Sequence, residues 1–212
     1  NLVVFFAIVF AGRLGEADQL GRVVLAFASL CLVSSGGYVI NDVLDAQKDR
    51  LHPEKKRRPV ASGAVGPSLA AGWALVLLGT GFGVASFLGE EFLAAASVLF
   101  VFMQAYSLFI KSAAFADVLL IGLNFAVRAI AGALVISVPF SSWLVLCTFL
   151  LGLFLALSKR YAEAQGMAEA HMHRRVLSRY TPAILSHLLI ISPTMLLMAD
   201  SIYVFTSASH SL

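Results

Sequence analysis

The feature that most constrains this chain is a series of long apolar segments that take up most of its 212 residues. At about 1.5 Å per residue, a helix of roughly 20 residues matches the hydrocarbon core of a bilayer, about 30 Å thick. With 59% hydrophobic and 13% charged residues, the composition excludes an ordinary soluble domain. Polar and apolar residues do not alternate as in barrel strands, so we expect an all-α, polytopic membrane helix bundle. The seven expected transmembrane helices lie at about 1–12, 21–41, 67–88, 91–110, 115–137, 142–158 and 182–206.

Basic residues are distributed unevenly over the connections between these segments. Twelve of the fifteen Lys and Arg follow the second, fourth and sixth segments. Cytoplasmic loops of membrane proteins carry an excess of Lys and Arg, so these three connections are expected to face the cytoplasm. The sequence therefore predicts a multi-pass protein of the cell inner (cytoplasmic) membrane, with its charged site facing the cytoplasm.

The first segment is too short to cross the hydrocarbon core unaided. It also lacks the charged start and the cleavage site of a signal peptide, so we interpret it as part of a longer helix. Cys31 and Cys147 lie within apolar segments, where buried thiols are expected rather than a disulfide. Residues 1–212 are expected to form one transmembrane domain, truncated at both ends.

An acidic row follows the second segment. On a helix, Tyr38, Asn41, Asp42, Asp45 and Asp49 succeed one another at steps of three or four, which places them along one face. Such a row can be a solvated helix end. However, neighbouring carboxylates repel one another unless a cation neutralises them, and hard oxygen ligands suit Mg²⁺. We therefore expect Asn41, Asp42, Asp45 and Asp49 to bind Mg²⁺, which usually arrives with the phosphates of a substrate.

A basic run, Lys55 to Arg58, comes directly after the acidic row. Four consecutive cations can serve only to keep the loop inside or to contact anionic lipid. The sharper interpretation is a lid that binds diphosphate, because Arg presents a planar fork to phosphate oxygens and Lys adds a point charge. Pro53 and Pro59 restrict the loop, and His52 is expected to form hydrogen bonds within it.

Further polar residues lie within or at the ends of later segments. Arg128 falls inside the fifth segment, where an unpaired charge costs at least about 2.5 kcal/mol, and an ionisable residue at such a depth indicates a functional site. Asp117 and Asn124 share its helix face, so a structural ion pair is the alternative. Lys111, and Lys159 with Arg160, end the fourth and sixth segments, where they either anchor the helices or line a polar cavity.

The acidic row reads NDVLDAQKD from Asn41 to Asp49, an intact NDxxDxxxD motif. Together with YSLFIK at 106–111 and the basic continuation HPEKKRRP at 52–59, it makes the chain resemble the UbiA superfamily of intramembrane prenyltransferases. The resemblance covers essentially the whole chain. It implies a cavity open to lipid, Mg²⁺ and diphosphate held by cytoplasmic acidic motifs, and nine helices in place of the seven expected here.

Aromatic prenyltransferases of this superfamily have a second acidic motif after the sixth helix, where this chain reads KRYAE. Cations there, with the FAVRAIAGA run, make the chain similar to the decaprenyl-phosphate phosphoribosyltransferase branch. That resemblance implies transfer of a 5-phosphoribosyl group from phosphoribosyl diphosphate to a polyprenyl phosphate, for cell envelope biosynthesis. Within it, Asp42, Asp45 and Asp49 would be catalytic through Mg²⁺ and the leaving diphosphate. The implied substrate-binding residues are Tyr38, Asn41, Lys55, Arg58 and Lys111 for the donor, and Arg128, Lys159 and Arg160 for the acceptor phosphate or the donor 5-phosphate.

Other functions remain open at this point. An aromatic or other lipid prenyltransferase of the same superfamily would use a polyprenyl diphosphate donor. A transporter or channel would use Asp117, Asn124 and Arg128 as its path, and a fragment lacking helices would be inactive. No nucleic-acid partner is expected, and association into a homo-oligomer is left open.

Overall fold

The structure is a computed structural model that describes residues 1–110, 115–165 and 182–209. Within these ranges every regular element is helical and there is no strand, which confirms the predicted all-α membrane bundle. The elements are η1 (Leu2–Phe5), α1 (Phe6–Phe10), α2 (Ala17–Leu44), α3 (Ala46–Arg50), η2 (Lys55–Arg57), α4 (Pro67–Leu88), α5 (Glu90–Ala105), the π-helical turn η3 (Tyr106–Ile110), α6 (Ala116–Val135), α7 (Ser142–Gln165) and α8 (Pro182–Ser209).

Six helices of the described residues are long and apolar enough to cross a membrane, against seven predicted segments. The difference lies in the first segment, which forms only η1 and the single turn of α1. Its side chains are nevertheless in the core, since Val4 and Ile8 are fully buried against Leu30, Phe92 and Val135. The first segment therefore contributes to the bundle interior without spanning it.

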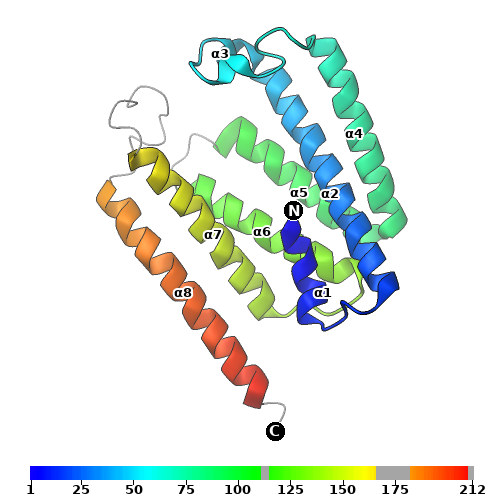
Figure 1. The fold of residues 1–212 in the computed structure, drawn as a ribbon, viewed down its shortest axis with the longest axis vertical. Coiled ribbons are helices and arrows are strands. Elements are labelled where there is room, and N and C mark those ends of the chain that lie inside the picture. The colour runs from blue at the N-terminus through cyan, green and yellow to red at the C-terminus, as the bar shows by residue number, and fades with distance from the viewer. Residues whose placement is uncertain (111–114, 166–181, 210–212) are drawn as a thin grey trace.

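The spanning helices run up and down through the bundle, and successive helices pack together (Figure 1). α2 lies along α4 on one side, while α7 packs between α6 and α8 on the other, and α5 contacts α2, α4 and α6. α3 lies at the end of the bundle where α2 finishes and α4 starts (Figure 1). At the opposite end Gly89 alone joins α4 to α5, with φ +125°, a conformation that residues with a Cβ rarely adopt.

Small residues allow the helices to approach closely. A Cβ added at Gly81 of α4 would lie 2.8 Å from Cγ2 of Val33, and one at Gly152 of α7 would lie 2.8 Å from Cβ of Phe125. At the first of these contacts the buried Ser29 hydroxyl donates a 2.8 Å hydrogen bond to the Gly81 carbonyl. Glycine at such contacts is typical of membrane helices, where close packing and interhelical hydrogen bonds replace the hydrophobic driving force.

Arg22 ties two helix ends together at the end of the bundle away from α3. Its Nε donates to the Val135 carbonyl at 2.8 Å, and its Nη2 donates to the Leu88 carbonyl at 3.4 Å. The last carbonyls of a helix lack partners within the helix and carry partial negative charge, so a guanidinium stabilises both ends. This contact gives one of the three cations outside the predicted cytoplasmic connections a structural role.

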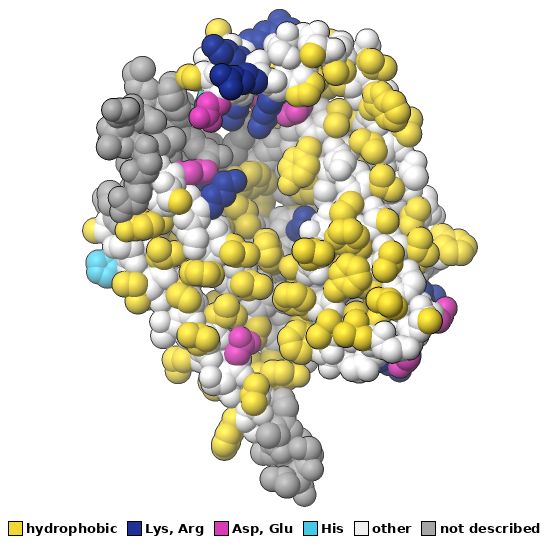
Figure 2. Space-filling view, in the orientation of Figure 1, with side chains coloured by type: hydrophobic (Ala, Val, Ile, Leu, Met, Phe, Trp, Pro, Cys, Tyr) yellow, Lys and Arg dark blue, Asp and Glu magenta, His cyan; other side chains and the backbone are white. Residues whose placement is uncertain are grey.

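Large hydrophobic side chains cover much of the outer surface (Figure 2). Leu75 and Phe87 of α4 and Ile190 and Phe205 of α8 are among those most exposed. A soluble protein rarely exposes so much contiguous apolar surface, but lipid tails solvate it well. The protein is therefore a multi-pass membrane protein, and its charged side chains gather near the end that carries α3 (Figure 2).

Candidate functional site

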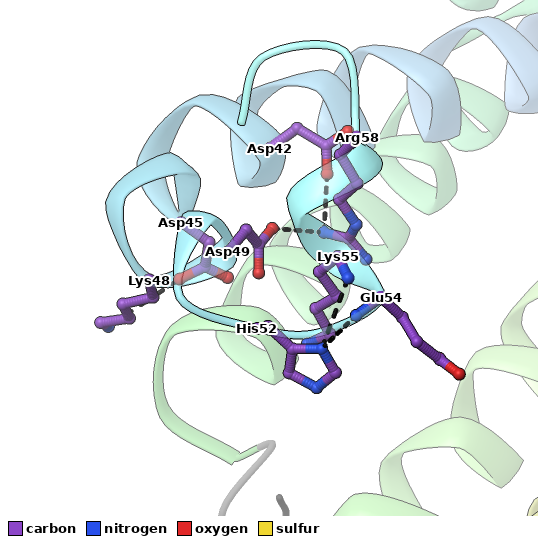
Figure 3. A network of polar contacts seen from close by, with 8 residues as sticks. All are labelled: Asp42, Asp45, Lys48, Asp49, His52, Glu54, Lys55 and Arg58. Carbon is purple, nitrogen blue, oxygen red and sulfur yellow. Dashed lines mark hydrogen bonds and ion pairs between the residues drawn. The ribbon is translucent and has the colours of Figure 1, made fainter. Parts of the chain in front are cut away.

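The acidic row does not lie on one uninterrupted helix. α2 ends at Leu44 and α3 begins at Ala46, with Asp45 between them at φ −90° and ψ 0°. The amide of Asp45 still donates to the Asn41 carbonyl at 2.9 Å, and the amide of Asp49 donates to the Asp45 carbonyl at 2.8 Å. The helical spacing therefore persists locally through a change of direction, and the carboxylates of α2 and α3 face a common loop (Figure 3).

Arg58 joins the two ends of the acidic row. Its Nη1 lies 2.8 Å from Oδ1 of Asp42 and 2.9 Å from Oδ2 of Asp49, so one nitrogen bridges carboxylates from two helices (Figure 3). The side chain of Asp49 is only 6% exposed, whereas that of Arg58 is 41% exposed. Lys48 lies near Asp45, with 3.8 Å between Nζ and Oδ1. The chain thus neutralises its acidic row with its own cations.

The loop after α3 is held in place by its own side chains. The ring Nδ1 of His52 accepts hydrogen bonds from the amides of Glu54 and Lys55 at 3.3 and 3.4 Å, which confirms its predicted role within the loop. Arg50 donates from Nε to the Ala61 carbonyl at 3.1 Å. Val60 is buried, which anchors the loop beside Arg58.

Four oxygen-bearing side chains in this motif suit a hard cation. Within the described ranges, no three His, Cys, Asp or Glu side chains converge closely enough to form a ready metal site. Two observations nevertheless favour a fit: Arg58 already places a positive charge between two of the carboxylates, and Oδ1 of Asn41 is buried without a hydrogen-bond partner. Carboxylate and amide oxygens are preferred ligands of Mg²⁺. The donor set therefore fits Mg²⁺ once Arg58 moves aside.

Arg128 lies in the middle of α6 and is held by polar side chains. Nε donates to Oδ1 of Asn1 at 2.8 Å, while Nη1 donates to the Asn124 carbonyl at 2.8 Å and reaches the Asn124 amide oxygen at 3.3 Å. Tyr38, on α2, has a largely exposed side chain. These neutral contacts leave the positive charge of Arg128 without a carboxylate among them, so the group suits an anionic ligand.

Arg160 is placed differently from the other predicted phosphate-binding cations. It is 2% exposed, and its three nitrogens reach Asp117 at 2.8 Å, Glu163 at 2.6 Å and the Tyr106 hydroxyl at 3.0 Å. The network joins η3, the start of α6 and the end of α7. Asp117 shares the helix face of Arg128, but it lies 11 residues, or about three turns, before it along α6, too far for an ion pair. It pairs instead with Arg160 of the adjacent α7. The two carboxylates and the hydroxyl stabilise the buried positive charge of Arg160 on α7.

Three predicted cations remain: Lys55, Lys111 and Lys159. Lys159 is exposed next to Arg160, and Lys55 is half-buried in η2. Lys111 lies outside the described residues, as does the whole stretch between α7 and α8, residues 166–181.

Three polar residues were not assigned a site role from the sequence. Asn1 holds Arg128, Tyr106 holds Arg160, and Gln104 has a buried Oε1 without a partner. The YSLFIK string pointed to Tyr106, but no pattern in the sequence distinguished Asn1 from an ordinary helix-end polar residue.

Cavities lie near both ends of the bundle. A small one, of about 310 Å³, lies beside Asp42 between α2, α4 and the loop, and is otherwise apolar. A larger one, of about 520 Å³, lies among α1, α7 and α8 and includes Asp200, but it contains none of the predicted site residues. Figure 2 shows a hollow below the charged end of the molecule, with Lys or Arg and Asp or Glu side chains at its edge.

Comparisons with known proteins agree with this architecture. Residues 2–211 match the UbiA prenyltransferase family. The chain is 32% identical over 192 residues to a decaprenyl-phosphate phosphoribosyltransferase of Mycolicibacterium smegmatis, covering 90% of this chain and 60% of the relative. It is 32% identical over 217 residues to the protein of the same name from Corynebacterium glutamicum, covering 100% of this chain and 65% of the relative. The chain thus spans just under two thirds of the length of these relatives.

A solved structure of a digeranylgeranylglyceryl phosphate synthase superimposes with a TM-score of 0.69 at 19% identity. The match covers 97% of this chain and 71% of that structure. At such low identity the likeness shows a common fold.

Proposed function

Because the chain belongs to the UbiA prenyltransferase family, whose members are membrane-bound transferases, we propose that it serves Mg²⁺-dependent transfer of a 5-phosphoribosyl group from phosphoribosyl diphosphate to a polyprenyl phosphate. The observation that carries this proposal is the similarity to two decaprenyl-phosphate phosphoribosyltransferases over 90% or more of this chain. The site supports it, since one acidic motif is combined with cations that suit two anionic phosphate substrates.

The donor would bind at the acidic row. Asn41, Asp42, Asp45 and Asp49 would hold Mg²⁺, which supplies charge stabilisation for the departing diphosphate. Tyr38, Lys55, Arg58 and Lys111 would bind the donor phosphates. Arg58 suits this role best among the described residues, because its guanidinium is partly exposed and already lies at the carboxylates.

The acceptor would bind deeper, towards Arg128. A lipid phosphate is already an anion, so its oxygen can attack the anomeric carbon without a strong general base. The new bond joins that oxygen to C1 of the ribose while the bond from C1 to the diphosphate oxygen breaks, and its electron pair leaves with the diphosphate. Arg128 can orient the acceptor phosphate through its planar fork, as Asn1 and Asn124 fix its position.

Lys159 and Arg160 complete the proposed cation set. Lys159 is exposed and needs no rearrangement to meet a phosphate. Arg160 would have to release one of its three protein partners before it could bind a phosphate. If it keeps all three, its role is to hold η3, α6 and α7 together. The positive-inside pattern favours a site that opens to the cytoplasm, where a soluble phosphorylated donor is available.

The proposal is tested by offering the protein two donors in parallel. Purified protein in liposomes with Mg²⁺ receives ¹⁴C-ribose-labelled phosphoribosyl diphosphate with polyprenyl phosphate, or a labelled polyprenyl diphosphate with an aromatic acceptor. We expect label in the lipid fraction only with the first pair, and its loss in Asp45→Ala. Transfer only with the second pair would replace the proposal with a prenyltransferase. Ion flux that survives Asp45→Ala, with neither transfer, would indicate a transporter.

A further inference from the structure

We propose that Arg58 is an internal counter-cation of the acidic row, and that a metal ion displaces it readily only when diphosphate binds at the same time. This inference rests on the proposed function, in which the row binds Mg²⁺. A single nitrogen, Nη1, lies within 2.9 Å of a carboxylate oxygen on each of Asp42 and Asp49. Because these residues belong to α2 and α3, the guanidinium also fixes one helix against the other.

Burial explains why a cation is needed here at all times. The carboxylate side chain of Asp49 is only 6% exposed, and a buried charge without a partner is strongly unfavourable. In the state described here Arg58 is its partner. When a metal ion takes those oxygens, Arg58 must leave, because two cations at the same oxygens repel each other.

The guanidinium needs an anion when it leaves. With a free metal ion alone, Arg58 would exchange two carboxylate contacts for water. With diphosphate present, it gains a doubly hydrogen-bonded phosphate partner. Metal and diphosphate should therefore strengthen each other's binding, and the coupling is reciprocal by thermodynamic linkage.

The local structure allows this exchange with movement of the side chain alone. The backbone near Arg58 is anchored by the buried Val60 and by the Arg50 hydrogen bond to the Ala61 carbonyl. The side chain itself is 41% exposed, so its outer end has access to solvent. Arg57, directly before it, is exposed and forms no ion pair with any of the described residues, which makes it a matched control for the charge of the loop.

The test measures binding of Mn²⁺ by electron paramagnetic resonance to the purified protein in detergent, with and without inorganic diphosphate. We expect wild-type protein to bind Mn²⁺ at least about tenfold more tightly when diphosphate is present. In Arg58→Gln, Mn²⁺ alone should bind about tenfold more tightly than in wild type, and diphosphate should add little. Arg57→Gln removes the same charge and should behave as wild type. Arg58→Lys keeps the charge but not the fork, so it should retain weak binding of Mn²⁺ alone and lose most of the coupling.

Unchanged Mn²⁺ affinity in Arg58→Gln, with intact coupling to diphosphate, would overturn the inference and leave the metal site standing. Equal effects in Arg57→Gln and Arg58→Gln would also overturn it, because general loop charge would then be the cause. Absence of Mn²⁺ binding by wild-type protein, with and without diphosphate, would refute both the inference and the proposed metal site.

Discussion

The buried pair of Asp117 and Arg160 allows the most quantitative prediction. The two side chains are 0% and 3% exposed and lie 2.8 Å apart, so Asp117→Asn leaves a buried guanidinium with one carboxylate less. Removing one partner of a buried ion pair costs about 3 to 5 kcal/mol. Glu163, at 2.6 Å, still neutralises Arg160 in the variant. We therefore expect the lower end of that range, about 3 kcal/mol of unfolding free energy.

The assay is reversible unfolding in mixed micelles of mild detergent and sodium dodecyl sulfate, followed by circular dichroism. Asp18→Asn is the matched control, since Asp18 is exposed in the first turn of α2 and its loss should cost under about 1 kcal/mol. The double variant Asp117→Leu with Arg160→Met replaces the pair by apolar groups and should recover most of the lost stability. A loss below about 1 kcal/mol in Asp117→Asn, or a double variant as unstable as the sum of the singles, would refute the reasoning.

Two further changes probe the packing and the deep cation. Gly81→Ala should destabilise the bundle by about 1 to 3 kcal/mol, because the added Cβ would lie 2.8 Å from Val33. Gly79→Ala on the same helix is the control: its Cβ meets nothing within 4 Å and should be tolerated. Equal unfolding midpoints for the two variants would contradict the described contact between α2 and α4. Arg128→Lys keeps the charge but loses the planar guanidinium held by Asn1 and Asn124, so the apparent KM for polyprenyl phosphate should rise about tenfold. Arg57→Lys should leave this KM unchanged. An unaltered KM in Arg128→Lys would exclude Arg128 from the acceptor site.

The sequence was sufficient for those features that depend on local pattern. Long apolar runs predicted the spanning helices, and the spacing of Asn41 to Asp49 predicted the helical backbone that continues from α2 towards α3. The binding of a metal ion by these side chains stays a prediction. The first segment was predicted as a transmembrane helix of the bundle; it is helical and is buried against Leu30 and Phe92, but it does not span. Each of these features follows from hydropathy or helical periodicity within one stretch of chain.

Pairings between distant residues could not be predicted in the same way. Asp117 and Arg160 are 43 positions apart, and their contact depends on which faces of α6 and α7 meet. Asp117 was therefore grouped with Arg128, which shares its helix face but lies about three turns further along α6. The change of direction at Asp45 was missed for a related reason. The backbone hydrogen bonds on both sides of Asp45 keep the helical spacing of the acidic row, so the sequence pattern is the same as that of one straight helix. Arg58 was recognised as a phosphate-binding residue, but its bridge between Asp42 and Asp49 arises only from the folded loop.

The most direct test of the central proposal follows the separate parts of the donor through one turnover. Phosphoribosyl diphosphate labelled with ¹⁴C in the ribose, ³³P in the 5-phosphate and ³²P in the diphosphate is incubated with the protein, polyprenyl phosphate and Mg²⁺. We predict equal amounts of ¹⁴C and ³³P in the lipid fraction, all ³²P in the aqueous phase, and no lipid label after chelation of the metal or in Asp42→Ala. Lipid that carries ³²P, or labelling that survives removal of both the metal and the Asp42 carboxylate, would contradict phosphoribosyl transfer at the acidic row.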